Sequence, residues 1–143
     1  MKKWLLLISA LLVTGFTQAE QFKTIKDAEV HYVVFNSTFM TPQVARSYGL
    51  KRNEFVATVN ISVLDRSSAG KPAMPVSING NAKNLIGQTK TLEFKEIKEG
   101  DAIYYLAQFP IVNEEQYRFT IDIDAGNKGR GPITFSQKLY VEP

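Results

Sequence analysis

The residues best suited to metal chemistry in this chain are a single histidine and two methionines. His31 is the only histidine, and Met40 and Met74 are the only methionines after Met1. Imidazole and thioether groups are the soft ligands that copper favours. A copper or small-ligand carrier is therefore one hypothesis, and it requires the three side chains to meet in a pocket between sheets. No closely spaced His–Met or Met–Met motif is present, so both methionines also fit a hydrophobic core.

A catalytic centre is harder to assemble from this sequence. His31 lies in the β-prone run VHYVVF at residues 30–35, and no nucleophile-elbow motif accompanies it. The chain has no cysteine, which excludes thiol chemistry. Glu114 and Glu115 are adjacent, so in a strand their carboxylates would point to opposite faces rather than flank one substrate. We predict that the protein is not an enzyme.

Two glycine-containing segments resemble binding loops only in part. Asp122 and Asp124 begin a DxDxGN sequence that lacks the third acidic position and the distal glutamate of a calcium loop. Alternating aspartates also suit the outer face of a strand, where they discourage edge pairing. GNKGRG at 126–131 lacks the Walker spacing of a phosphate loop. We therefore predict no metal and no cofactor.

A small basic surface is the remaining candidate site. Its members are Arg46, Tyr48, Lys51 and Arg52. Clustered cations can bind an anionic group or a partner protein. Cations at a helix C-terminus are also favourable on their own account and are then merely solvated. The sequence leaves both interpretations open.

One short helix positions these residues. Thr41 fits the N-cap, Pro42 the first helical position, and Gly49 the left-handed residue that ends a helix. Residues on one side of this helix are predicted to share a buried face: Val44, Ala45 and Tyr48. A helix of two turns is unstable alone, so it must pack against something larger.

Most of the remaining chain has the alternation of β-strands. The strand after the helix places one set of apolar residues inward: Phe55, Ala57, Val59, Ile61 and Val63. Residues 89–97 and 102–111 flank KEGD and predict a hairpin. Prolines indicate an edge strand at 73–78, followed by a turn or bulge at Asn79-Gly80-Asn81.

Together these patterns predict an all-β fold, an antiparallel immunoglobulin-like β-sandwich of seven to eight strands with one short helix. Tyr117 begins a late strand just after a corner. It fits equally well the tyrosine that pins such corners through its hydroxyl and an ordinary core tyrosine.

The N-terminus predicts export. Residues 1–19 combine Lys2 and Lys3, an apolar run at 4–13 and the small-residue site ending at Ala19. This is the pattern of a cleaved signal peptide, and residues 20–143 are then a single domain in the periplasm with no membrane span. Loss of the two lysines lowers the formal net charge from +3 to +1. A nearly neutral domain lacks the strong positive charge of nucleic-acid-binding proteins, so we predict no nucleic-acid partner.

The chain also resembles a known family along almost all of this domain. HYVVFNSTFMTPQVARSYGLKRNEFVATVNISVL, GKPAMPVSINGNAKNL and the closing KLYVEP are similar to the DUF4426 family of exported gammaproteobacterial proteins. The resemblance implies an immunoglobulin-like sandwich and assigns no biochemical role. Our leading hypothesis is a non-catalytic periplasmic binding or assembly module whose partner is another periplasmic or envelope protein.

Overall fold

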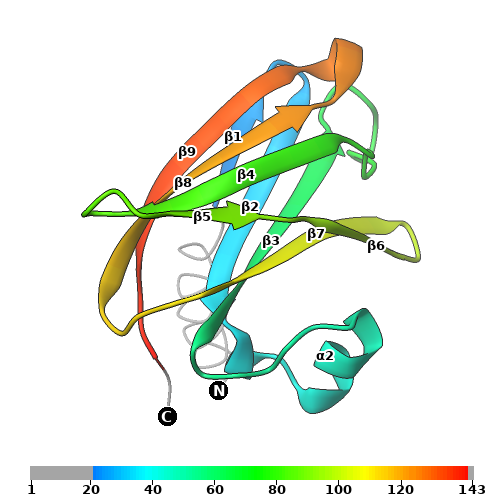
Figure 1. Ribbon diagram of the computed structural model, residues 1–143. Coiled ribbons are helices and arrows are strands. Elements are labelled where there is room, and N and C mark those ends of the chain that lie inside the picture. The colour runs from blue at the N-terminus through cyan, green and yellow to red at the C-terminus, as the bar shows by residue number, and fades with distance from the viewer. Residues whose placement is uncertain (1–20, 142–143) are drawn as a thin grey trace, which may run out of the picture.

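Alternating apolar residues build two antiparallel sheets that pack face to face (Figure 1). The computed structural model describes residues 21–141. The five-stranded sheet contains, in order, β1 (Phe22–Ile25), β2 (Ala28–Asn36), β3 (Val56–Asp65), β7 (Ala102–Pro110) and β6 (Lys95–Glu99). The four-stranded sheet contains β5 (Thr89–Leu92), β4 (Ser77–Asn84), β8 (Glu115–Asp124) and β9 (Arg130–Leu139). The predicted β-sandwich is confirmed.

The core fills the space between the two sheets. Val59 and Ile61 of β3 face Phe119 and Ile121 of β8, and all four are fully buried. Phe109 meets the ring of Phe119 edge-on, with centroids 5.7 Å apart. Burial of this kind is the main source of stability, because the chain has no cysteine for a disulfide.

The structure has nine strands because one predicted strand divides between the sheets. Lys95–Glu99 pairs with β7 as the expected hairpin, whereas Thr89–Leu92 pairs with β4 in the other sheet. Phe94 lies between the two segments and packs against the core. The chain therefore changes sheets at residues 93–94, and the prediction of one continuous strand at 89–97 is wrong.

The predicted turn or bulge at residues 79–81 is also wrong, because the register of β4 with β8 is continuous through these residues. These residues lie inside β4, and the turn follows at 85–88. A Cβ at Gly80 would lie 2.7 Å from the carbonyl oxygen of Thr120. Gly80 therefore allows close approach of β4 and β8, which is the other common reason for a glycine inside a strand.

Tyr117 is the tyrosine of a β-sandwich corner. Its hydroxyl accepts a hydrogen bond from the backbone N–H of Val112, 3.3 Å away and five residues upstream. Its ring is almost fully buried and meets Phe109 edge-on at 5.2 Å. This bond settles the choice that the sequence left open and fixes the connection between β7 and β8.

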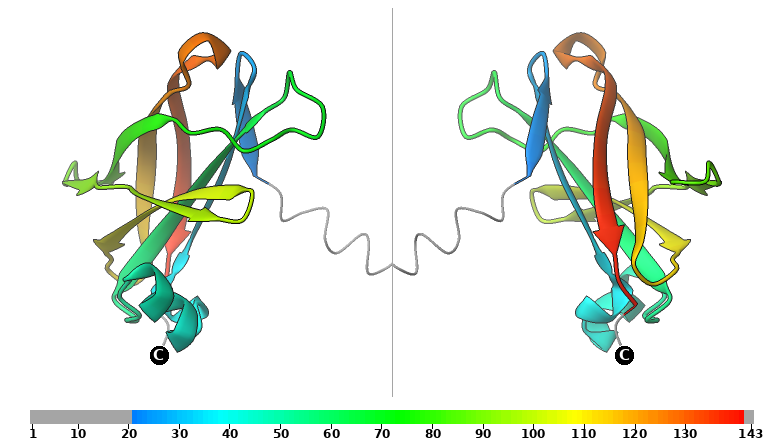
Figure 2. Two further views of the ribbon diagram at one scale, coloured as in Figure 1. Left: turned by 90° about the vertical axis from the view of Figure 1, so that its right-hand side faces the viewer. Right: turned by 90° about the vertical axis from the view of Figure 1, so that its left-hand side faces the viewer.

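The antiparallel topology gives the sandwich two ends with different connections. The α2 end consists of residues 37–55, 111–114 and 140–141, and it carries η1 (Ser37–Phe39) and α2 (Pro42–Tyr48). The β4–β5 turn at residues 85–88 projects from the side of the sandwich, away from α2 (Figure 1). The opposite end consists of residues 26–27, 66–76, 100–101 and 125–129, which include η2 (Gly126–Lys128). Figure 2 shows α2 below the layered strands in both side views. Between residues 21 and 141, no helix combines the length and apolar character that crossing a bilayer requires.

Candidate functional site

The short helix forms as the sequence predicts. The Thr41 hydroxyl accepts a hydrogen bond from the Val44 N–H at 3.2 Å, and Pro42 occupies the first turn. Gly49 ends the helix with a φ of 67°. The predicted buried face is only partly present, because Ala45 is buried whereas Val44 is 40% exposed. Packing through Ala45 alone is a small contact, so polar contacts must help to hold the helix.

Those polar contacts come from two of the four predicted site residues. The Tyr48 hydroxyl donates to the carboxylate of Glu99, and Lys95 Nζ donates to the Tyr48 carbonyl at 2.7 Å. The Lys51 N–H donates to Gln108 Oε1 at 2.9 Å, while the Lys51 carbonyl accepts from Gln108 Nε2 at 2.8 Å. Tyr48 and the Lys51 backbone thus anchor the helical segment to β6 and β7.

The two arginines have different roles. Arg52 Nε donates to the Met40 carbonyl at 2.7 Å, and its guanidinium also reaches the Thr38 carbonyl at 3.3 Å. Arg52 therefore supports the backbone on both sides of Phe39. Arg46 is exposed in the last turn of α2, and within residues 21–141 its side chain has no hydrogen bond or ion pair. Lys51 is likewise exposed, and only its backbone is hydrogen-bonded, so Arg46 and Lys51 have the side chains available to a partner.

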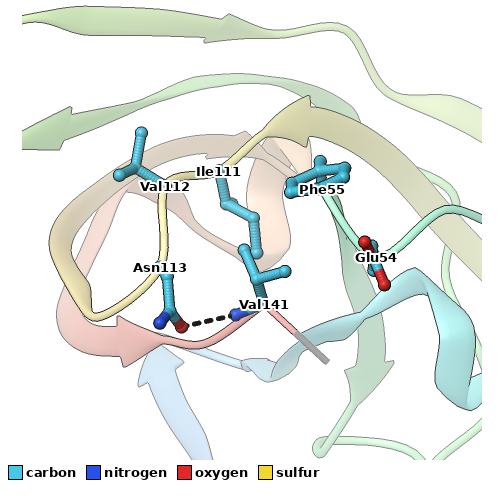
Figure 3. A pocket seen from close by; sticks show the side chains of 6 residues that line it. All are labelled: Glu54, Phe55, Ile111, Val112, Asn113 and Val141. Carbon is cyan, nitrogen blue, oxygen red and sulfur yellow. Dashed lines mark hydrogen bonds between the residues drawn. The ribbon is translucent and has the colours of Figure 1, made fainter. Parts of the chain in front are cut away.

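An apolar groove that the sequence did not reveal lies at the same end. Its lining is formed by Glu54, Phe55, Ile111, Val112, Asn113 and Val141, and its volume is about 490 Å³ (Figure 3). Asn113 Oδ1 accepts a hydrogen bond from the Val141 N–H at 2.9 Å, and the Ile111 N–H donates to the Phe55 carbonyl at 2.9 Å. These two bonds join the walls of the groove.

Phe55 was predicted to face the core, and this prediction is wrong. Its side chain is 54% exposed and lines the groove. β3 begins one residue later, at Val56, so Phe55 belongs to the turn that precedes the strand. Strand alternation holds only where the ladder is formed, and the sequence gives no clear sign of where that ladder starts.

Further apolar side chains are exposed around this groove. Phe39 is 68% exposed, Val112 62% and Tyr140 49%. Asn36 Nδ2 donates to the carbonyls of both Glu54 and Tyr140, at 2.8 and 3.0 Å, which ties the groove to the strand end beside it. We call Phe39, Phe55, Val112, Tyr140 and Val141 the apolar surface. The sequence signal for it is modest: Phe39 and Val112 are large apolar residues outside any alternating strand.

The predicted copper ligands do not converge. His31 lies on the outer side of β2, between residues that face the core. Met74 packs against the core, and its N–H donates to the Val63 carbonyl. Met40 follows η1 at the α2 end. Among the described residues, no group of three or more His, Cys, Asp and Glu side chains could hold a metal ion.

His31 instead lines a groove near the opposite end, together with Phe22, Glu29 and Lys71. Its Nε2 lies 2.7 Å from Glu29 Oε2, and Lys71 Nζ lies 3.1 Å from the other carboxylate oxygen. The hydrogen bond from His31 is the largest influence on Glu29 and lowers the pKa of that carboxyl, with Lys71 adding to the effect. Phe22 covers the imidazole with ring centroids 5.2 Å apart. The arrangement resembles a satisfied ion-pair network more than an open catalytic base.

Comparisons with known proteins agree with the fold. The chain is 35% identical to a DUF4426 family protein of Pseudomonas aeruginosa PAO1, whose crystal structure it matches with a TM-score of 0.77 over 90% of this chain and 100% of that one. A copper-bound variant of FetP from uropathogenic Escherichia coli strain F11 is 19% identical, with a TM-score of 0.54 over 85% of this chain and 89% of that one. At this lower identity the likeness shows the fold alone.

A second FetP structure, the protein as isolated after recombinant expression in the periplasm of E. coli, gives 18% identity and a TM-score of 0.53 over 82% of this chain and 90% of that one. No curated protein matches the chain. A family model described as a domain of unknown function covers residues 22–142, almost the whole of the two-sheet domain. Together with the Pseudomonas relative, this match shows that the chain belongs to the DUF4426 family.

Proposed function

We propose that the protein is a non-catalytic binding module of the bacterial periplasm that docks a partner protein at the α2 end. The observation that supports this best is the concentration of exposed apolar residues there. Five of the nine large hydrophobic residues that are exposed lie at this end: Phe39, Val44, Phe55, Val112 and Tyr140. Contiguous exposed apolar surface is typical of interaction sites in soluble proteins.

The chemistry of the surface indicates what the partner presents. The groove lined by Phe55, Val112 and Val141 suits apolar side chains, and aromatic residues such as Phe39 and Tyr140 are typical anchors in interfaces. Arg46 and the Lys51 ammonium add positive charge at the same end. The partner is therefore a segment of an envelope protein that combines apolar side chains with a carboxylate.

Export supports the proposed compartment. Residues 1–19 have the features of a signal peptide, although they lie outside the described residues. The described domain has no cysteine and needs no disulfide, so its stability is independent of the redox state of the compartment.

Photo-cross-linking in cells tests the proposed surface. A photoreactive phenylalanine at Phe55 should give a discrete adduct with one envelope protein. The same residue at Val33, which is 43% exposed on the outer side of β2, is the matched control and should give none. Equal adducts from both positions would count against a specific surface at the α2 end.

Titration of the purified partner then tests the chemistry. Phe39→Asp and Arg46→Glu should each weaken binding roughly tenfold or more, since truncating a central anchor typically costs more than about 1.4 kcal/mol. Arg46 is preferable to Arg52 for charge reversal, because Arg52 also holds the carbonyls on either side of Phe39. Unchanged affinity in both variants would remove this surface from the proposal.

The alternative is a copper carrier, which the copper-bound state of FetP brings into consideration. His31 lies against Glu29, but among residues 21–141 no group of three or more His, Cys, Asp and Glu side chains could hold a metal, and two ligands fall short of a copper site. Thermal unfolding with and without copper decides between the proposals. The docking proposal expects no copper stabilisation, whereas stabilisation that disappears in His31→Ala would favour the carrier.

A further inference from the structure

The turn between β4 and β5 carries the two most exposed large hydrophobic residues of the described chain. Leu85 is 82% exposed and Ile86 80% exposed, and both lie at the tip of the turn. In Figure 1 this turn projects from the sandwich, away from the core. Moving two adjacent, exposed aliphatic side chains out of water is favourable in free energy. Such an exposed pair therefore indicates a surface that is covered when the protein binds its target.

The turn is a structured element. Asn84 Oδ1 accepts from the Gln88 N–H at 2.8 Å, and Asn84 Nδ2 donates to Gln88 Oε1 at 2.8 Å. Two backbone hydrogen bonds close the turn. The Asn84 N–H donates to the Gln88 carbonyl at 3.0 Å, and the Gly87 N–H donates to the Asn84 carbonyl at 3.1 Å. Gly87 has a φ of 88°, which favours glycine. The aliphatic pair is therefore presented in a fixed conformation.

Cations lie directly behind this pair. Lys83 pairs in register with Arg118 of β8, and Lys90 pairs with Ala82. Between residues 21 and 141 none of these three cations takes part in an ion pair. One carboxylate lies close by, that of Glu115, whose Oε2 is 3.4 Å from Asn84 Nδ2. The tip is thus apolar, and the strand residues closest to it carry mainly positive charge.

We propose that the tip of this turn, Leu85 and Ile86, inserts into the surface of an anionic membrane. Lys83 precedes Leu85 by two residues, or about 7 Å along a strand. Apolar groups of peripheral proteins enter the headgroup–acyl boundary by about 5–10 Å, so the cations would reach the depth of the lipid phosphates. This role goes beyond the docking of a partner protein.

The shape of the tip favours a membrane over a protein pocket. The pair is convex and aliphatic, whereas protein anchors are enriched in aromatic residues and pair with complementary pockets. The charge of Lys83, Lys90 and Arg118 complements phosphatidylglycerol, the anionic lipid used as the probe below. A lipid surface accepts a protruding aliphatic tip without any preformed cavity.

Vesicle co-sedimentation tests the proposal with the purified protein from a full-length gene. Vesicles containing phosphatidylglycerol should bind the protein at low salt, and pure phosphatidylcholine vesicles should bind it more weakly. The double variant Leu85→Ser/Ile86→Ser should lose roughly tenfold or more in partitioning, as expected when buried aliphatic contacts are removed. Val33→Ser is the matched apolar control and should bind as the wild type does.

Charge and insertion are tested separately. Lys83→Glu should reduce binding severalfold, whereas Lys98→Glu makes the same change in net charge on β6 and should have little effect. In Leu85→Trp, tryptophan fluorescence should shift to the blue on anionic vesicles, relative to the wild type measured in parallel. All three substitutions are at exposed positions, and thermal unfolding checks that each variant folds.

Three results would overturn the proposal: no binding of the wild type to anionic vesicles, unchanged binding of Leu85→Ser/Ile86→Ser, or no spectral shift in Leu85→Trp. If the tip instead occupies a protein pocket, vesicle binding is absent while the photo-cross-linked complex at Phe55 weakens in the double variant. Retention of the Phe55 cross-linked complex in both Phe39→Asp and Arg46→Glu, with normal vesicle binding, would reject only the docking proposal, so the two ideas fail separately.

Discussion

The two ends of the sandwich solve the same structural problem in different ways. Each end must satisfy the backbone of several connections that leave the sheets. At the opposite end, Asp65 accepts from the hydroxyls of Ser67 and Ser68 and lies 3.2 Å from Lys128. The Asp27 N–H donates to the Lys128 carbonyl, so three connections are tied together through polar groups. The α2 end is also hydrogen-bonded, but it leaves aromatic and aliphatic side chains exposed.

This difference indicates where the molecule is built to interact. Hydrogen bonds such as those of Asn36 and Asn113 hold the α2 end in place without covering its apolar surface. Stability therefore does not require these residues to be apolar, whereas the opposite end depends on its polar contacts. Variants that lower stability are expected mainly in the supporting contacts of each end, and variants that change binding mainly on the apolar surface.

Gly129→Ala should have the largest effect on stability. A Cβ at this position would lie 2.1 Å from the Ile25 carbonyl oxygen, and the φ of 147° is one that other residues rarely adopt. We expect a loss of about 3 kcal/mol in the free energy of unfolding, measured by urea denaturation.

Gly126→Ala is its control in the same loop. It has a φ of 61° but open space around the added Cβ, so the loss should be about 1 kcal/mol. Equal losses in the two variants would show that the close approach to Ile25 does not constrain the opposite end.

Tyr117→Phe should have the next largest effect, at the α2 end. It removes the acceptor of the Val112 N–H beneath the groove, and we expect a loss of about 1–2 kcal/mol. Tyr140→Phe, at an exposed position, should be close to neutral.

The effect of Tyr117→Phe on the free energy of unfolding should depend on pH. Burial raises the pKa of Tyr117 to about 12. Because the unfolded tyrosine ionises near pH 10, its contribution is complete below pH 10 and lost as the pH rises toward 12. The stability difference between wild type and Tyr117→Phe should therefore shrink over that range, and a constant difference would contradict the assignment.

The sequence predicted the parts of this comparison that depend on local chemistry. Thr41, Pro42 and Gly49 each carry a specific conformational preference, and together they define α2. Alternation in β3 likewise predicted the buried positions of Ala57, Val59, Ile61 and Val63. The apolar surface escaped prediction because an exposed Phe55 and a buried Ile61 look alike in a sequence, and only the register of the strand separates them.

Gly80 is a second case in which the local sequence was misleading. Asn-Gly-Asn is a turn signal locally, but the contact between β4 and β8 overrides it. For the basic surface, the sequence pointed to Arg46 and Arg52 as candidate binding residues, but it contained no sign that Arg52 donates to backbone carbonyls. In both cases the structure depends on contacts with residues distant in the sequence: Thr120 for Gly80, and Thr38 and Met40 for Arg52.

Glu29→Gln should have a smaller effect, at the opposite end. It removes the charge that pairs with His31 and Lys71, and we expect a loss of about 1 kcal/mol at neutral pH. Because the pKa of Glu29 is lowered from 4.5, its contribution is complete above about pH 4.5 and lost as the pH falls through the lowered pKa. The variant should lose this acid dependence in thermal unfolding, whereas Glu114→Gln, at an exposed corner, should keep it.

Phe39→Ser and Val112→Ser should have the smallest effect on stability. Both side chains are mostly exposed, so the free energy of unfolding should change by less than about 0.5 kcal/mol. Denaturation midpoints close to that of the wild type would support a role in binding. A loss comparable to that of Tyr117→Phe would mean that these residues serve the fold, and the contrast between the two ends would disappear.

The position of Val141 has a practical consequence. This residue lines the groove, and its N–H is held by Asn113, so any polypeptide that follows it leaves from the rim of that groove (Figure 3). An affinity tag fused downstream would sit where the proposed partner docks and would compete with it. Capture experiments should therefore carry the label elsewhere, for instance in the β6–β7 turn at residues 100–101.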